Sequence, residues 1–159
     1  QAYLGTSTFV MSSMAGTWTF EVEVTPAGGT TAEMVVFPIT VETKTDARLY
    51  NFMSDMKGYF VALVEPMDPG VGINDYEIVI YKRESMMSWP PVTNLNVEID
   101  PQMPSMGHGS PNNVNPVHTE NGHYQGKVNF TMTGYWQVNQ DIKDETGALL
   151  DEGFFDIRF

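Results

Sequence analysis

The sequence contains no cysteine. This absence excludes disulfide bonds, thiolate zinc sites and a cysteine nucleophile. It also fits an oxidising compartment in which the protein folds without covalent cross-links. We therefore expect any fold to be held by the packing of its core.

Positive charge is scarce, with 8 Lys and Arg residues against 20 Asp and Glu residues and a formal net charge of -12. Such a chain does not attract phosphates or acidic lipids, so nucleic acid and anionic membrane surfaces are poor partners. The simpler explanation of the acidity is that it keeps an exported protein soluble.

Membrane-spanning and catalytic patterns are missing as well. No apolar run approaches the roughly 18 residues that span a bilayer, and no signal peptide is present. The chain begins with Gln1 instead of Met, so we expect a processed or trimmed protein whose export signal has been removed. No nucleophile elbow or phosphate-binding glycine loop occurs, and no pattern points to a small-molecule substrate. These absences predict a protein that is not an enzyme.

The chain does contain short runs rich in Val, Ile, Thr and aromatic residues, which alternate with period two between Gly, Pro and Asn clusters. Alternation of this kind predicts β-strands, and the fold class is therefore all-β. The expected strands are 17–24, 33–43, 58–66, 76–83, 94–100, 122–132, 135–143 and 153–159. Residues 46–58 hold either a turn of helix or a linker.

An internal repeat joins the two ends of the chain. Its matches are Tyr3, Gly5, Phe9 and Met11 with Tyr124, Gly126, Phe130 and Met132, then Gly16, Trp18, Phe37 and Ile39 with Gly134, Trp136, Phe155 and Ile157. We interpret residues 58–159 as one complete β-domain, 44–57 as a linker and 1–43 as the C-terminal half of a second domain. The missing strands would leave a sheet edge exposed, and a homodimer that exchanges strands through this incomplete half-domain is one way to cover it.

The candidate site lies in a loop, 101–122, that is rich in Pro, Gly and Asn and long for a compact domain. Met103, Met106 and His108 fall within six residues there, and His118 or His123 could complete the set. Thioether sulfur is a soft ligand that suits Cu(I), and imidazole suits both oxidation states of copper. The pattern therefore favours copper, with Cu(I) preferred.

A competing interpretation gives these residues no ligand. The two methionines would then pin the loop to the edge of the sandwich, because methionine fills irregular apolar gaps. The histidines would be solvated loop residues. In that case the protein is a structural or protein-interaction module.

Three blocks resemble the YtkA-like/FixH-like domain family: EPMDPGVGINDYEIVIYKRE, NLNVEIDPQMPSMGHG and GHYQGKVNFTMTGYWQVNQDI. The resemblance covers roughly residues 60–159, and half of the pattern recurs in 3–41. It implies an immunoglobulin-like antiparallel β-sandwich in an exported protein of the periplasm or cell envelope, lipid-anchored in some architectures. It also implies a copper-transport or other envelope protein as partner, and it places Met103, Met106 and His108 on the Met/His motif of the family.

Overall fold

The computed structural model describes residues 16–41, 48–86 and 88–159, and the match of Tyr3, Gly5, Phe9 and Met11 lies outside them. The chain divides into two compact units, Gln1–Thr45 and Asp46–Phe159. Every strand pair in the described residues is antiparallel. No helix capable of crossing a membrane occurs in these ranges.

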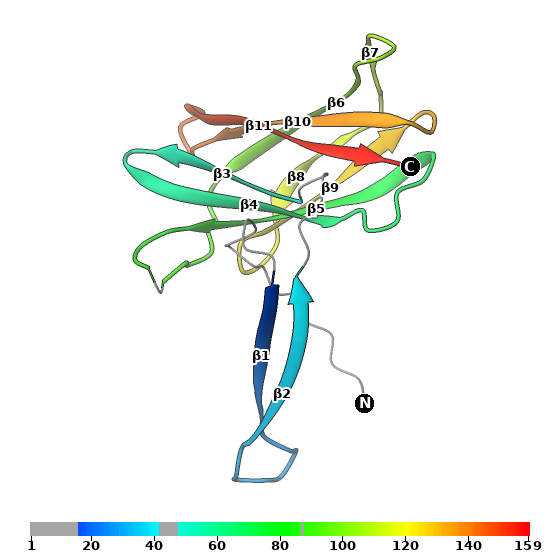
Figure 1. The fold of residues 1–159 in the computed structure, drawn as a ribbon. Coiled ribbons are helices and arrows are strands. Elements are labelled where there is room, and N and C mark those ends of the chain that lie inside the picture. Colours follow the sequence, from blue (N-terminus) through cyan, green and yellow to red (C-terminus); the bar gives the residue numbers. More distant parts are fainter. Residues whose placement is uncertain (1–15, 42–47, 87) are drawn as a thin grey trace. The chain divides into compact units, whose positions relative to one another are not determined.

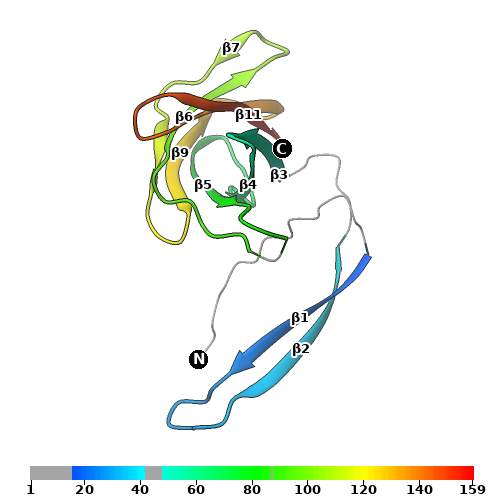
Figure 2. The same ribbon diagram turned by 90° about the vertical axis from the view of Figure 1, so that its left-hand side faces the viewer.

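The first unit contains a two-stranded hairpin, β1 (Gly16–Val24) paired with β2 (Glu33–Val41). Figure 2 shows it as a long, twisted ribbon. Its register places Trp18 opposite Ile39 and Phe20 opposite Phe37. Because residues that face each other across an antiparallel pair lie on the same side, most apolar side chains of the two strands share one face, while Met34, Val36 and Pro38 lie on the other.

The second unit contains a five-stranded sheet in the order β3-β4-β5-β9-β8. Its strands are β3 (Leu49–Ser54), β4 (Lys57–Glu65), β5 (Gly72–Lys82), β9 (His123–Phe130) and β8 (Val114–His118). A four-stranded sheet follows the order β11-β10-β6-β7. Its strands are β11 (Leu149–Arg158), β10 (Tyr135–Lys143), β6 (Asn96–Met103) and β7 (His108–Gly109).

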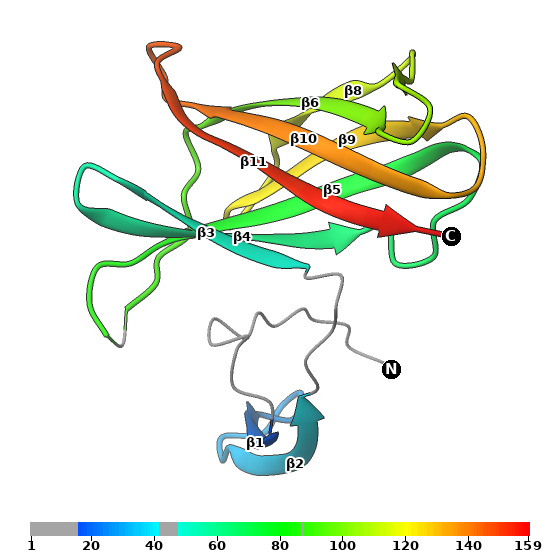
Figure 3. The same ribbon diagram turned by 45° about the horizontal axis from the view of Figure 1, so that its top comes forward.

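The two sheets lie face to face as the layers of a β-sandwich (Figure 1). Figure 3 looks onto the four-stranded layer, with the five-stranded layer behind it. The inward residues of both sheets form one apolar core, whose largest fully buried members are Trp136, Tyr76, Tyr124, Phe130 and Phe155. The predicted all-β antiparallel sandwich is therefore confirmed, whereas its immunoglobulin-like assignment remains a prediction.

In the predicted segment 46–58, the described residues 48–58 form neither a helical turn nor a plain linker, because they contain β3 and the turn into β4. Phe52 points into the core with 7% of its surface exposed, while its neighbour Met53 is 68% exposed. The loop predicted over 101–122 is shorter in the structure. Its first three residues belong to β6, and it contains the short strands β7 and β8.

One part of the core is polar. The hydroxyl groups of Tyr50 and Tyr76 and both amide atoms of Gln140 are buried without a hydrogen-bond partner in the described structure. Burial raises the pKa values of both tyrosines above their ordinary range, so both are neutral at physiological pH. Buried polar atoms without partners reduce stability, so the effect of these groups can be tested by apolar substitution.

Candidate functional site

The β6–β7 hairpin brings together three of the five predicted site residues. Met103 is opposite His108 in the register, and Met106 lies in the turn between them. The backbone N–H groups of Met106 and Gly107 both donate to the carbonyl oxygen of Met103, each at 3.0 Å. Gly107 has φ +64°, a left-handed conformation that glycine adopts without strain. The Pro-Ser-Met-Gly sequence therefore folds back tightly enough to place Met103 and His108 side by side.

Met103 and His108 lie on the same face of the β6–β7 hairpin, and Met103 is buried in the core. Residues that are opposite each other in an antiparallel pair project from the same side of the sheet. Met103 is 3% exposed, and its terminal methyl carbon lies 3.2 Å from the point that a Cβ on Gly134 would occupy. His108 is half-buried. This arrangement gives the hairpin one buried sulfur and one partly accessible imidazole on the same face.

The ring of Trp136 lies next to His108. This ring is fully buried, and the His108 ring meets it edge-on with a centroid distance of 6.1 Å. The indole N–H of Trp136 donates to the carbonyl oxygen of Met132 at 2.9 Å, which fixes the orientation of the ring. The imidazole of His108 therefore lies beside a fully buried aromatic ring whose orientation is fixed.

Met106 is the exposed member of the group, with 61% of its surface accessible. It occupies the turn, between the strand that carries Met103 and the strand that carries His108. A thioether in this position meets solvent and any approaching protein before the other two donors do.

His118 and His123 lie elsewhere, on β8 and β9 of the five-stranded sheet. Phe130, at the other end of β9, contacts Trp136 at a centroid distance of 5.4 Å. His123 stands seven residues before Phe130, which corresponds to about 23 Å along an extended strand. The structure therefore does not place either histidine beside Met103, because His123 lies at the far end of β9 and His118 pairs with Tyr124 from β8. Their part in the set remains a prediction.

Each of these two histidines has its own local contacts. Nδ1 of His123 lies 2.6 Å from Oε1 of Glu77. The ring of His118 packs edge-on against Tyr124 at 5.4 Å. Nothing in these contacts converges on the β6–β7 hairpin.

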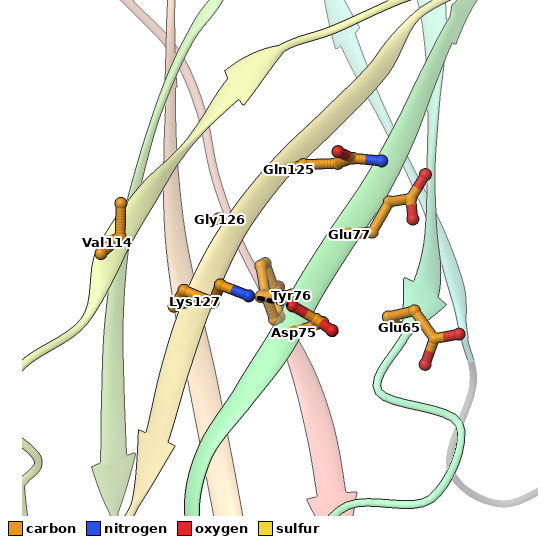
Figure 4. Close-up of a pocket in the computed structure, with 8 residues that line it drawn as sticks. All are labelled: Glu65, Asp75, Tyr76, Glu77, Val114, Gln125, Gly126 and Lys127. Atoms are coloured by element: carbon orange, nitrogen blue, oxygen red, sulfur yellow. Dashed lines mark hydrogen bonds and ion pairs between the residues drawn. The ribbon is translucent and has the colours of Figure 1, made fainter.

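Sequence reasoning missed a groove of about 520 Å³ on the outer face of the five-stranded sheet. Figure 4 shows that it is lined by carboxylates from β4 and β5 and by polar side chains from β9. Lys127 forms an ion pair with Asp75, while Glu65 and Glu77 carry the remaining negative charge. The alternation of polar residues in 72–82 and 123–130 could have indicated a polar outer face, although not its curvature.

Acidic residues also lie side by side across three strands of the four-stranded sheet. Glu98 and Glu152 both face Asp141 directly, one from each neighbouring strand. Lys143 approaches Glu98 at 2.6 Å and Asp141 at 3.8 Å, and its hydrogen bond to Glu98 raises the pKa of Lys143. Both outer faces of the sandwich therefore carry acidic side chains.

Hard-ligand metal chemistry has no assembled site in residues 16–41, 48–86 and 88–159. No three His, Asp or Glu side chains converge there in a way that could hold a metal ion. Thioether sulfur is a different class of ligand, suited to soft ions. Met103, Met106 and His108 supply two sulfurs and one nitrogen on one hairpin, so this donor set fits Cu(I) by chemistry.

No curated protein and no solved structure matches the chain significantly. A family model does match it over residues 53–140, which is more than half of the chain. The match includes the β6–β7 hairpin, His118 and His123, and it leaves residues 1–52 outside, so the second partial copy remains a prediction. The chain belongs to the YtkA-like family.

Proposed function

We propose that this chain is a non-enzymatic copper-binding module of the periplasm or cell envelope. The observation that carries the proposal is the cross-strand pair of Met103 and His108. It sets a soft sulfur and an imidazole side by side on a hairpin whose turn presents a second thioether, that of Met106. Ligands of this kind favour Cu(I) over zinc, magnesium and calcium.

The accessible turn supports a role in copper transfer. Met106 is exposed while Met103 is buried, so an incoming ion would meet an accessible thioether before a shielded one. We propose that a copper-transport or other envelope protein delivers or receives the ion at this hairpin. The absence of cysteine and the strongly acidic composition support export, and an upstream lipid anchor would hold the module at the envelope.

A Cu(I) competition titration tests this proposal. The protein is titrated against a chromophoric Cu(I) chelator, alongside a Met103→Leu/His108→Gln variant that preserves side-chain volume. A Met67→Leu/His118→Gln variant removes the same two donor types at other positions and serves as the control.

We expect the wild-type protein and the control variant to withdraw one equivalent of Cu(I) from the chelator. The Met103→Leu/His108→Gln variant should withdraw none. Equal competition by all three proteins would show that the hairpin does not bind the ion.

One observation favours a second function, that of a structural or protein-interaction module without metal. Met103 packs against the turn at Gly134, as a core residue does. This function predicts that a Met103→Ala/Met106→Ala/His108→Ala variant has a lower melting temperature than wild type in metal-free buffer. It also predicts that copper raises the melting temperature of neither protein.

A further inference from the structure

The β1–β2 hairpin has the same strand register as the β10–β11 hairpin. Phe20 faces Phe37 as Val138 faces Phe155. Eight of the nine residues of β1, 17–24, follow this correspondence at one constant offset. The turns share one hydrogen bond, because Gly29 donates to Pro26 at 2.9 Å and Gly147 donates to Asp144 at 3.0 Å. They differ in the position of the left-handed glycine, which is Gly28 in the first turn and Gly147 in the second.

The corresponding faces differ in burial. One face of the first hairpin carries eight apolar residues, together with Gly16 and Glu33: Trp18, Phe20, Val22, Val24, Val35, Phe37, Ile39 and Val41. None of them is buried, and Phe37 is 49% exposed. Its counterpart Phe155 is 1% exposed, because the five-stranded sheet covers the inner face of β10 and β11. An amphipathic hairpin with this pattern is suited to the same kind of cover.

The edges differ too. β10 pairs with β11 on one side and with β6 on the other, whereas β1 pairs only with β2 among the described strands. In the four-stranded sheet, β10 pairs with β6 from Gln137 to Lys143. The corresponding stretch of β1, from Thr19 onward, has no strand partner on this side among the described residues, so an added strand could pair with its backbone N–H and C=O groups.

We infer that the β1–β2 hairpin is a docking element for the complementary part of a second β-sandwich. Its occupant is a polypeptide that supplies a strand antiparallel to β1 and an apolar sheet face over the eight residues. The evidence for this occupant is the matching β10–β11 hairpin of the same molecule. That hairpin pairs with an adjacent strand, β6, and is covered by the apolar face of the five-stranded sheet.

The side chains of the hairpin specify this partner further. Gly153 lies under the ring of Tyr50, and any Cβ at that position would overlap the ring. The residue at the corresponding point of the first hairpin is Val35. The covering sheet must therefore carry a small side chain where the five-stranded sheet carries Tyr50. Likewise, Val22 stands where the second hairpin has Gln140, so the covering sheet needs no polar group opposite Val22.

A second copy of the hairpin is a poorer occupant. Two strands of nine residues present a face of about 300 Å², from the strand rise and spacing. A second hairpin would cover this face but would leave the edge of β1 unpaired if the two apolar faces met. A partner with more strands can cover the face and pair with the edge at the same time.

The test transplants the hairpin within the full chain. Residues 134–159 are replaced by the sequence of residues 16–41, which has the same length, in proteins that carry either Tyr50 or Tyr50→Ala. The same Tyr50→Ala change in the unaltered chain is the matched control, and thermal unfolding of all four proteins is followed by circular dichroism.

We expect Tyr50→Ala to lower the melting temperature of the unaltered chain and to raise that of the transplant. This reversal of sign measures the fit between Val35 and a small covering residue. A transplant that shows no cooperative unfolding with either residue would overturn the proposal. So would a Tyr50→Ala effect of the same sign in both backgrounds.

Hydrogen exchange on the unaltered chain tests the occupant independently. We expect the amides of Thr19–Val24 that face the free edge to exchange within about tenfold of free-chain rates at every protein concentration. Protection that increases with concentration, together with a dimer in sedimentation equilibrium, would show that a second copy is the occupant and would overturn the proposal.

Discussion

The hairpins β1–β2 and β10–β11 share a register, but only the second is buried in a core. The alternation of apolar residues is sufficient to align both pairs of strands, since Trp18 faces Ile39 as Trp136 faces Ile157. Burial depends on what lies opposite: Ile157 is 5% exposed beneath the five-stranded sheet, while Ile39 remains half-buried. Pairing is therefore a local property of these sequences, whereas stability is a property of the sandwich that receives them.

The largest effect should come from one phenylalanine in each hairpin. Phe155→Ala removes a ring that is 1% exposed, and we expect it to lower the free energy of unfolding of the sandwich by about 3–5 kcal/mol. Phe37→Ala removes a ring that is 49% exposed, and we expect a change within about 0.5 kcal/mol. Urea denaturation of both variants measures the difference, and equal losses would mean that the first hairpin is also part of a core.

The next effect concerns the glycine beneath Tyr50. Gly153→Ala places a methyl group inside the van der Waals radius of the Tyr50 ring, so we expect a loss of about 1–3 kcal/mol. Val35→Ala, at the corresponding position of the first hairpin, should change stability little because Val35 is exposed. A Gly153→Ala protein as stable as wild type in the same denaturation would show that Tyr50 moves aside without cost.

A smaller effect of opposite sign is expected at Gln140, where the first hairpin has Val22. Both amide atoms of Gln140 are buried without a partner in the described structure. Gln140→Leu replaces them with apolar atoms of similar volume, and we expect the free energy of unfolding to rise by about 1–2 kcal/mol. A clear loss of stability would mean that an ordered water satisfies the amide, which water–protein NMR contacts would then detect.

The smallest effect should come from the turns. Oδ1 of Asp144 accepts hydrogen bonds from the hydroxyl of Thr146 at 2.6 Å and from the backbone of Ala148 at 2.9 Å, and these bonds lower the pKa of Asp144. Its corresponding residue in the first hairpin is Pro26, which has no carboxylate. Because the pKa of Asp144 is lower in the folded state, the ionised carboxylate stabilises that state above the unfolded-state pKa of about 3.9. This contribution is lost as the pH falls from there through the lower pKa of the folded state.

We therefore expect Asp144→Asn to be less stable than wild type at pH 7 and to converge with it at acidic pH. Melting temperatures measured between pH 7 and pH 2.5 check this convergence. A constant difference across the range would exclude the carboxylate as its cause.

Much of the sandwich could be predicted from sequence, but β3 could not. Its turn into β4 uses Asp55 and Met56, both with positive φ. Such two-residue turns are usually recognised by a glycine, as in Asn-Gly or Asp-Gly, and the methionine conceals this one. β8 was missed because Pro116 interrupts its pattern, although an edge strand tolerates proline.

The candidate site was predictable only in part. The spacing of Met103, Met106 and His108 places them on one tight hairpin, as a local pattern can indicate. The separation of His118 and His123 from them depends on which sheet each strand joins. Trp136 becomes part of the site through the pairing of β10 with β6, a contact between residues distant in sequence.

X-ray absorption at the copper edge of the Cu(I)-loaded protein tests the central claim most directly. We predict that the first shell contains both sulfur and nitrogen scatterers, that Met103→Leu reduces the sulfur contribution, and that His108→Gln removes the nitrogen contribution. A first shell that neither substitution alters, or a protein that retains no copper after desalting, would contradict the assignment of copper binding to the β6–β7 hairpin.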